Sequence, residues 1–156
     1  MSDISRKEPP SNLLQPDWTT YFHAKPYIET SFDHQKIICF SNQHESAYIL
    51  QKVQLQIGKT YLFSARFAKE GKAEGAPFVI TIQYYDMNKK LLEFGLYAHI
   101  LKTDMEEADS GWYEYRGITK KVPEATLYAL VIINKISSID VAPVLVANCQ
   151  LIDITI

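Results

Sequence analysis

Hydrophobic and polar residues alternate along most of the chain, and this alternation predicts β-strands. Residues 59–90 show it best, with two long alternating runs, a polar loop at 70–77 between them, and a tight polar turn after them. Because successive side chains of a strand point to opposite faces, such runs predict strands with one buried face. We expect the segment to form a β-hairpin. The buried face of this hairpin is expected to contain Tyr61, Phe63, Phe78, Ile80 and Ile82.

Further runs of the same kind occur throughout the chain. The stretch 18–32 is aromatic but is interrupted by Pro26, so it is expected to hold short edge strands at most. No segment has a sustained period of 3.6 residues. The pattern predicts an all-β fold, a jelly-roll β-sandwich of two antiparallel sheets with eight to nine strands. A short strand is expected at residues 36–41, and further strands are expected at residues 47–56, 60–68, 78–85, 91–102, 112–119, 126–134 and 144–156.

The chain is expected to be one folded domain with a tail. Its 156 residues are the size of a single domain. Residues 1–15 are polar, rich in proline and aperiodic, which is typical of a flexible tail or linker, and residues 16–156 are expected to form the single jelly-roll domain. Thr103 and Glu106 have the spacing of a capping box, which predicts one short helical turn in that connection.

Composition excludes several classes of partner. The net charge of −2 provides no basic excess for binding nucleic acid. No apolar run is long enough to insert into a membrane, and the N-terminal residues do not resemble a signal peptide. We therefore expect either a cytoplasmic protein or a domain excised from a longer chain.

Residues with catalytic or metal-binding chemistry are sparse. The four histidines are isolated from one another, and no nucleophile, phosphate-binding or zinc motif is present. Cys39 and Cys149 lie in strand-like runs, where they are expected to be small buried hydrophobic residues rather than a disulfide. The sequence therefore predicts a protein that is not an enzyme, with no catalytic residues and no metal ligands.

Five short motifs, in order along residues 16–156, resemble carbohydrate-binding modules of families 4, 9 and 22. They are GKTYLFS at 58–64, IQYYD at 82–86, GWYEY at 111–115, PEAT at 123–126 and LIDITI at 151–156. The resemblance implies a β-sandwich like that of galactose-binding domains, with a concave face that binds a polysaccharide or glycan. It also implies an accessory role beside a parent enzyme or an assembly partner.

Many members of these families hold a structural calcium ion, but the motif for it is incomplete here. The opening motif is absent around Pro16, Asp17 and Trp18, and the closing pair of aspartates is reduced to Asp153, with Ile152 in the other position. No cofactor is therefore predicted.

Candidate ligand-binding residues are polar or aromatic residues that alternate with core residues. Sugars stack their C–H groups on aromatic rings, and their hydroxyls pair with amides and charged groups. In residues 91–102 the alternation places Phe94 in the core and Glu93 on the outer face. Trp112 is expected to pack in the core at the sheet edge, and Trp18 is open to either interpretation. The candidates are Arg66, Gln83, Tyr85, Tyr97, His99, Tyr128 and Asn134.

These residues are equally typical of an ordinary outer sheet face, so two functions stay open. One is a non-catalytic carbohydrate-binding module that is accessory to a larger protein or system. The alternative is a structural or protein-interaction jelly roll, for assembly or oligomerisation, with no sugar ligand. A sandwich enzyme would need a cluster of titratable groups, which the sequence does not provide.

Overall fold

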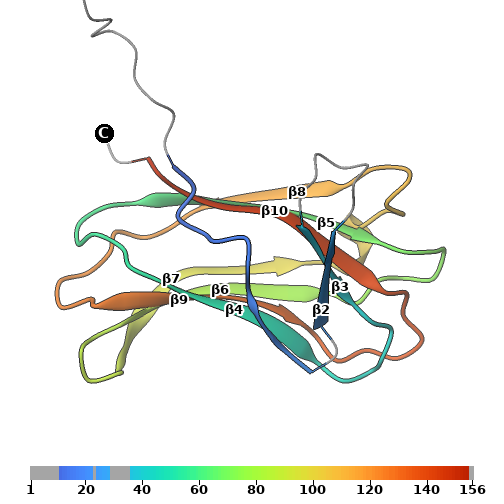
Figure 1. Cartoon of the computed structure of the whole chain (residues 1–156), viewed down its shortest axis with the longest axis horizontal. Coiled ribbons are helices and arrows are strands. Elements are labelled where there is room, and N and C mark those ends of the chain that lie inside the picture. Colours follow the sequence, from blue (N-terminus) through green and yellow to red (C-terminus); the bar gives the residue numbers. More distant parts are fainter. Residues whose placement is uncertain (1–10, 23, 29–35, 155–156) are drawn as a thin grey trace, which may run out of the picture.

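The computed structural model describes residues 11–22, 24–28 and 36–154, whose strands form two antiparallel sheets packed face to face (Figure 1). The first sheet contains, in spatial order, β1 (Thr19–Tyr21), β4 (Ala47–Val53), β9 (Tyr128–Lys135), β6 (Phe78–Tyr85) and β7 (Leu91–Ile100). The second sheet contains, in spatial order, β2 (Ala24–Ile28), β3 (Lys36–Phe40), β10 (Val144–Asp153), β5 (Tyr61–Lys69) and β8 (Tyr113–Ile118). The predicted all-β sandwich of two antiparallel sheets is confirmed.

Each of the eight ranges between residues 36 and 156 that were predicted to be strands contains one strand. The short strands β1 and β2 lie at sheet edges within residues 18–32. The 3-10 turn η1 (Lys102–Asp104) follows β7, close to the predicted helical turn. Asp104 rather than Thr103 caps it, because the Asp104 carboxylate accepts a hydrogen bond from the Leu101 N–H at 2.8 Å. Within the described ranges, no helix has the length and apolar character needed to cross a membrane.

The segment 59–90 is not a hairpin, so that prediction was wrong. β5 pairs with β10 and β8 in the second sheet, whereas β6 pairs with β9 and β7 in the first. The loop 70–77 crosses from one sheet to the other, and the Glu70 N–H donates to the Pro143 carbonyl at 2.9 Å. Alternation identifies the buried side chains, but both sheets bury one face, so it does not show which sheet a strand joins.

The core lies between the inner faces of the two sheets. The five side chains that the sequence predicted to be buried here are all at most 2% exposed. Phe78, from the first sheet, has its ring centroid 5.2 Å from that of Phe40 and 5.1 Å from that of Phe67. Phe40 and Phe67 belong to the second sheet, so this aromatic cluster joins the layers.

A β-bulge at Gly95 reverses the alternation in β7. The pairing of β7 with β6 passes over Gly95, which is the extra residue. Phe94 therefore points to the outer face, where it is 38% exposed, and Glu93 lies opposite the core residue Tyr84. The sequence predicted Phe94 in the core and Glu93 outside, and both positions were wrong because one inserted residue exchanges the faces.

The outer face of the second sheet is partly covered. A small buried cluster lies there, formed by Ile37, Leu145 and Ala147. Trp112 packs against this cluster and not within the main core, which corrects its predicted position. Cys39 packs there too, and both Cys39 and Cys149 are free thiols.

The start of the described chain links the two sheets. The Leu13 N–H donates to the Leu151 carbonyl of β10 at 2.9 Å. The Gln51 side chain of β4 exchanges two hydrogen bonds with the backbone of Gln15, at 2.9 and 2.7 Å. Specific contacts therefore begin within residues 1–15, where the sequence predicts a tail.

One lysine is fully buried at the end of β9. The exposed fraction of Lys135 is 0%, and its Nζ donates to the carbonyl oxygens of Ser41, at 3.2 Å, and of Gln43. Burial lowers the pKa of this amine, and the Glu45 carboxylate opposes that shift. The ammonium thereby holds the loop between β3 and β4 against the first sheet, next to Asn134.

Candidate functional site

The outer face of the first sheet presents rows of side chains that run across its strands, and strand register fixes which are neighbours. One row spans all five strands through Tyr21, Tyr48, Asn134, Val79 and His99. The next row contains Thr19, Leu50, Ile132, Thr81 and Tyr97. A third contains Lys52, Leu130, Gln83 and Phe94, and a fourth contains Tyr128, Tyr85 and Leu91.

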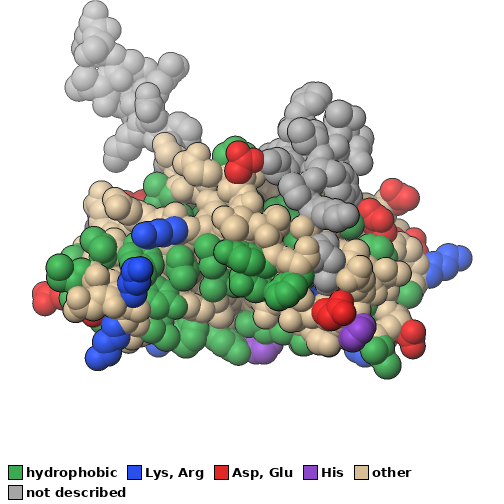
Figure 2. Space-filling model, turned by 60° about the horizontal axis from the view of Figure 1, so that its bottom comes forward, with side chains coloured by type: hydrophobic (Ala, Val, Ile, Leu, Met, Phe, Trp, Pro, Cys, Tyr) green, Lys and Arg blue, Asp and Glu red, His purple; other side chains and the backbone are tan. Residues whose placement is uncertain are grey.

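These rows form a shallow groove of about 400 Å³ across β4, β9, β6 and β7. Its floor is aliphatic, with Leu50, Val79 and Ile132. Aromatic rings border it on two sides, Tyr48 from β4 and the pair Phe94 and Tyr97 from β7. Thr81, Gln83 and Asn134 complete the lining. Hydrophobic side chains gather on this side of the molecule, with charged groups toward its borders (Figure 2).

The Gln83 amide is held by neighbours on its own strand. The Tyr85 hydroxyl donates to Gln83 Oε1, and Gln83 Nε2 donates to Thr81 Oγ1 at 3.1 Å. The amide keeps a second N–H and further lone pairs in a fixed direction. A polar group that is already positioned loses less entropy when a ligand binds.

Asn134 lines the groove. Its Oδ1 is buried and makes no hydrogen bond to the part of the chain that the structure describes. Such an atom costs about 1–3 kcal/mol compared with a paired one. A ligand hydroxyl in the groove would relieve this cost once the amide rotates toward it.

Tyr97 is the most exposed side chain of the groove lining, at 58%. Its ring makes edge contacts with Phe94 on one side, at 5.7 Å between centroids, and with His99 on the other, at 5.3 Å. These contacts restrain a ring that remains largely open to solvent. An exposed and restrained ring is suited to stacking on an apolar surface of a ligand.

Beyond the groove, Tyr85 and Tyr128 stack on each other, with centroids 5.3 Å apart and planes 10° apart. The Lys52 ammonium lies 4.3 Å from the Tyr128 centroid. Neither ring belongs to the groove lining, so the pair borders the groove.

The structure brings six of the seven predicted ligand-binding residues onto one face. Gln83, Tyr97 and Asn134 line the groove, and Tyr85, His99 and Tyr128 lie beside it on the same sheet. Arg66 lies on β5 of the second sheet, with Ala147 and Glu114 as its register neighbours. The expectation that Arg66 shares a face with Gln83 and Tyr85 was wrong, because it depended on the hairpin.

Sequence reasoning missed two thirds of the groove lining. Tyr48 and Thr81 carried a usable signal, since both alternate with buried residues. Leu50, Val79 and Ile132 did not, because hydrophobic side chains on an outer face contradict the rule that polar residues point to solvent. Phe94 was predicted in the core because the bulge at Gly95 reverses the alternation.

No protein-family model matches the chain, and no curated protein matches it in sequence. Solved structures do match its fold. A xylan-binding domain from Paenibacillus barcinonensis, its CBM22-1 module, matches with a TM-score of 0.64 and 11% identity, over 97% of this chain and 99% of that one. The module TmCBM61, solved in complex with β-1,4-galactotriose, matches with a TM-score of 0.60 and 13% identity, over 92% of this chain and 99% of that one. The chain has the fold of a carbohydrate-binding module.

A viral protein shares this carbohydrate-binding-module fold. The enzymatically active domain of tailspike protein 4 from bacteriophage CBA120 matches with a TM-score of 0.71 and 12% identity, over 92% of this chain. The chain spans about one fifth of that protein, 21% of its length.

The sheet face that bears the groove carries little charge. Among the outward positions of its four rows, Lys52 is the one Lys or Arg, and none is Asp or Glu. Glycoside hydrolysis generally requires two carboxylates that flank the scissile bond. Neither carboxylate is present among the side chains of these four rows.

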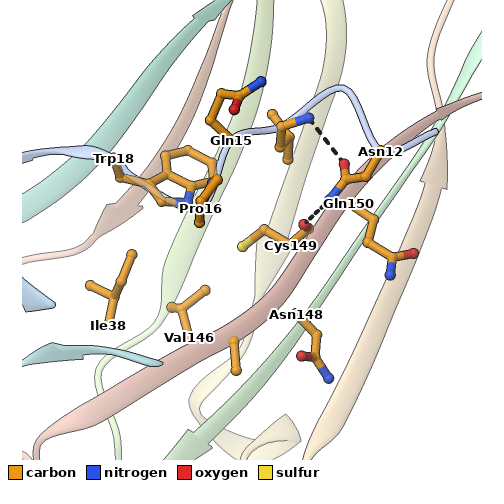
Figure 3. A pocket seen from close by; sticks show the side chains of 11 residues that line it. Asn12, Gln15, Pro16, Trp18, Ile38, Val146, Asn148, Cys149 and Gln150 are labelled. Carbon is orange, nitrogen blue, oxygen red and sulfur yellow. Dashed lines mark hydrogen bonds between the residues drawn. The ribbon is translucent and has the colours of Figure 1, made fainter. Parts of the chain in front are cut away.

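A second hollow, of about 340 Å³, lies at the edge of the sandwich where the first described residues cross β10 (Figure 3). Trp18 and Cys149 line it, and Asn12 closes one side by donating from Nδ2 to the Cys149 carbonyl at 3.0 Å. Burial raises the pKa of the Cys149 thiol to about 12. Trp18 also packs against the main core, so one part of its ring contacts the core and another lines the hollow.

The residues near the end of β10 do not fit a calcium site. The Asp153 carboxylate pairs with the Lys59 ammonium at 2.8 Å. Across the part of the chain that the structure describes, no group of three His, Cys, Asp or Glu side chains gathers to hold a metal ion. The Lys59 ammonium thus supplies, beside Asp153, the positive charge that a calcium ion would supply.

Proposed function

We propose that this module binds a glycan without cleaving it, in the groove of the first sheet, and that it serves a larger protein or system as an accessory. The observation that carries the proposal is the composition of the groove. Exposed Tyr97 offers a ring for stacking, Gln83 offers a fixed amide, and Asn134 has a buried polar atom that makes no hydrogen bond to the described residues. The absence of carboxylates from the rows favours a neutral glycan.

The matched structures support this choice of ligand class. One is described as a xylan-binding domain, and another is a complex with β-1,4-galactotriose. The outer face of the second sheet is a poorer candidate, since a hydrophobic cluster and Trp112 cover part of it.

The proposal can be tested by affinity electrophoresis through gels that contain xylan, β-1,4-galactan or a soluble cellulose derivative. Calorimetry with the matching oligosaccharides then measures the affinity. We expect retardation in at least one gel, and loss of that retardation in Tyr97→Ala. Ile118→Ala removes an exposed hydrophobic side chain from the second sheet and should bind as the wild type does. Wild-type protein that binds no glycan of a broad panel, or Tyr97→Ala that binds normally, would overturn it.

The aliphatic groove floor favours a second candidate, a protein-interaction surface for assembly. Leu50, Val79 and Ile132 give the groove an apolar floor that another protein would cover as readily as a sugar would. Light scattering separates the two functions, because assembly through this face predicts a mass that rises with concentration and falls in Ile132→Lys. A monomer at all concentrations that binds a glycan supports the first candidate.

A further inference from the structure

Three aromatic side chains stand together where β1 and β4 meet, at the border of the groove described above. Tyr21 and Tyr48 are register neighbours whose rings stack, with centroids 4.4 Å apart and planes 18° apart. The Phe22 ring meets that of Tyr48 edge to face at 6.2 Å. Tyr48 also lines the groove, so the cluster continues the groove surface onto β1.

Phe22 has two properties that work against stability. Its side chain is 75% exposed, so it buries little apolar surface. Its φ is 66°, in the left-handed region that bulky residues rarely adopt. Strained residues of this kind concentrate at ligand-binding positions, where the strain holds a side chain in a useful orientation.

The first row of the groove face links this cluster to the opposite edge of the sheet. It runs from Tyr21 through Tyr48 and Asn134 to His99, across five strands. With about 4.8 Å between neighbouring strands, the row spans roughly 19 Å. That length accommodates several linked sugars, and the row carries no Lys, Arg, Asp or Glu.

We infer that Tyr21, Phe22 and Tyr48 form a further sugar subsite, which binds an uncharged sugar of the same glycan chain that occupies the groove. The inference rests on the proposed function and adds a direction to it, since the glycan runs across the strands from β7 to β1. Stacking on an exposed ring suits the C–H face of a neutral pyranose. Glycans too short to reach β1 would not contact the subsite.

Calorimetry with xylo-, cello- and β-1,4-galacto-oligosaccharides of two to six sugars tests the subsite. For the series of oligosaccharides that binds, we expect the affinity of the wild type to rise with the number of sugars. Phe22→Ala and Phe22→Gly should lose about tenfold in affinity for the longest member and leave the shortest member that binds unchanged. Phe22→Tyr keeps an aromatic ring and should retain the wild-type length dependence.

Phe22→Gly also separates binding from folding. Glycine adopts a φ of 66° without strain, so this variant should unfold at the same Tm as the wild type or a higher one while it loses the long oligosaccharide. A variant that binds all lengths normally, or weakens all of them equally, overturns the subsite but leaves the proposed function standing if Tyr97→Ala abolishes binding. Wild-type protein that binds no oligosaccharide overturns both.

Discussion

Gly95 lies directly against the ring of Tyr84. A Cβ on Gly95 would stand 2.4 Å from both Cζ and the hydroxyl oxygen of Tyr84. The Tyr84 hydroxyl donates to the Lys120 carbonyl at 2.7 Å, and the Lys120 N–H donates to the Gly95 carbonyl at 2.9 Å. The bulge that turns Phe94 toward the groove is therefore fixed from the inner side of the sheet.

Gly95→Ala should lower the free energy of unfolding by about 1–3 kcal/mol, because the added methyl overlaps the Tyr84 ring. It should also weaken glycan binding, since Phe94 depends on the bulge for its position. Urea denaturation and calorimetry measure the two effects. In a Tyr84→Leu background the same substitution should cost less, and costs that simply add would contradict the proposed contact.

Phe63→Ala should lower the free energy of unfolding by about 3–5 kcal/mol, because the side chain is fully buried between the sheets. Phe22→Ala removes the same side chain from an exposed position and should change stability by less than about 0.5 kcal/mol. Chemical denaturation of both variants provides the comparison. Similar values for the two would show that Phe63 does not lie in the core.

Gln83→Leu should weaken glycan binding about tenfold, because the groove loses its fixed amide, while the fold is retained. Arg66→Ala should leave binding unchanged, because Arg66 lies on the opposite sheet. Calorimetry against the oligosaccharide that binds the wild type measures both variants. Weakening by Arg66→Ala but not by Gln83→Leu would place the ligand on the second sheet.

Alternation within the strands was sufficient to predict the sandwich and the buried faces of strands such as β5 and β6. It predicted the core positions of Phe63 and Phe78 because burial on one face leaves a period of two residues in the sequence. It could not predict that β5 and β6 join different sheets, since that choice depends on contacts distant in sequence. For this reason the sequence placed Arg66 on the wrong sheet.

The groove was harder to predict than the core. Gln83, Tyr97 and Asn134 were found because polar and aromatic residues alternate with buried ones. Phe94 was missed because a single bulge inverts the pattern without a clear signal in the sequence; only the glycine in the strand interior hints at it.

Lys135 should make stability depend on pH in the alkaline range. Its pKa in the folded protein is lowered below the ordinary value of 10.5 by burial. Between the lowered and the ordinary pKa the unfolded chain binds more protons than the folded one, so stability rises with pH across that window. Urea denaturation from pH 8 to 11 should show the wild type gaining relative to Lys135→Met, a comparison that cancels the contribution of the tyrosines. A constant difference would contradict the lowered pKa.

Removal of divalent cations should leave the protein unchanged. The Lys59 ammonium already pairs with Asp153, so EDTA should not shift Tm, and added calcium should not raise it. Asp153→Asn should lower stability by less than about 1 kcal/mol, because both partners are 35% exposed. A Tm that falls in EDTA and recovers with calcium would reveal a metal site.

The contacts of Leu13 with Leu151 place both ends of the described chain beside β10, on the sheet opposite the groove (Figure 1). A fluorophore, an affinity tag or a solid support attached at residue 11 or residue 154 would therefore lie on the side of the second sheet. The groove of the first sheet would then face the solution. Protein immobilised in this way would leave the groove accessible to long polymers. Attachment through the first sheet would instead turn the groove toward the support and exclude them.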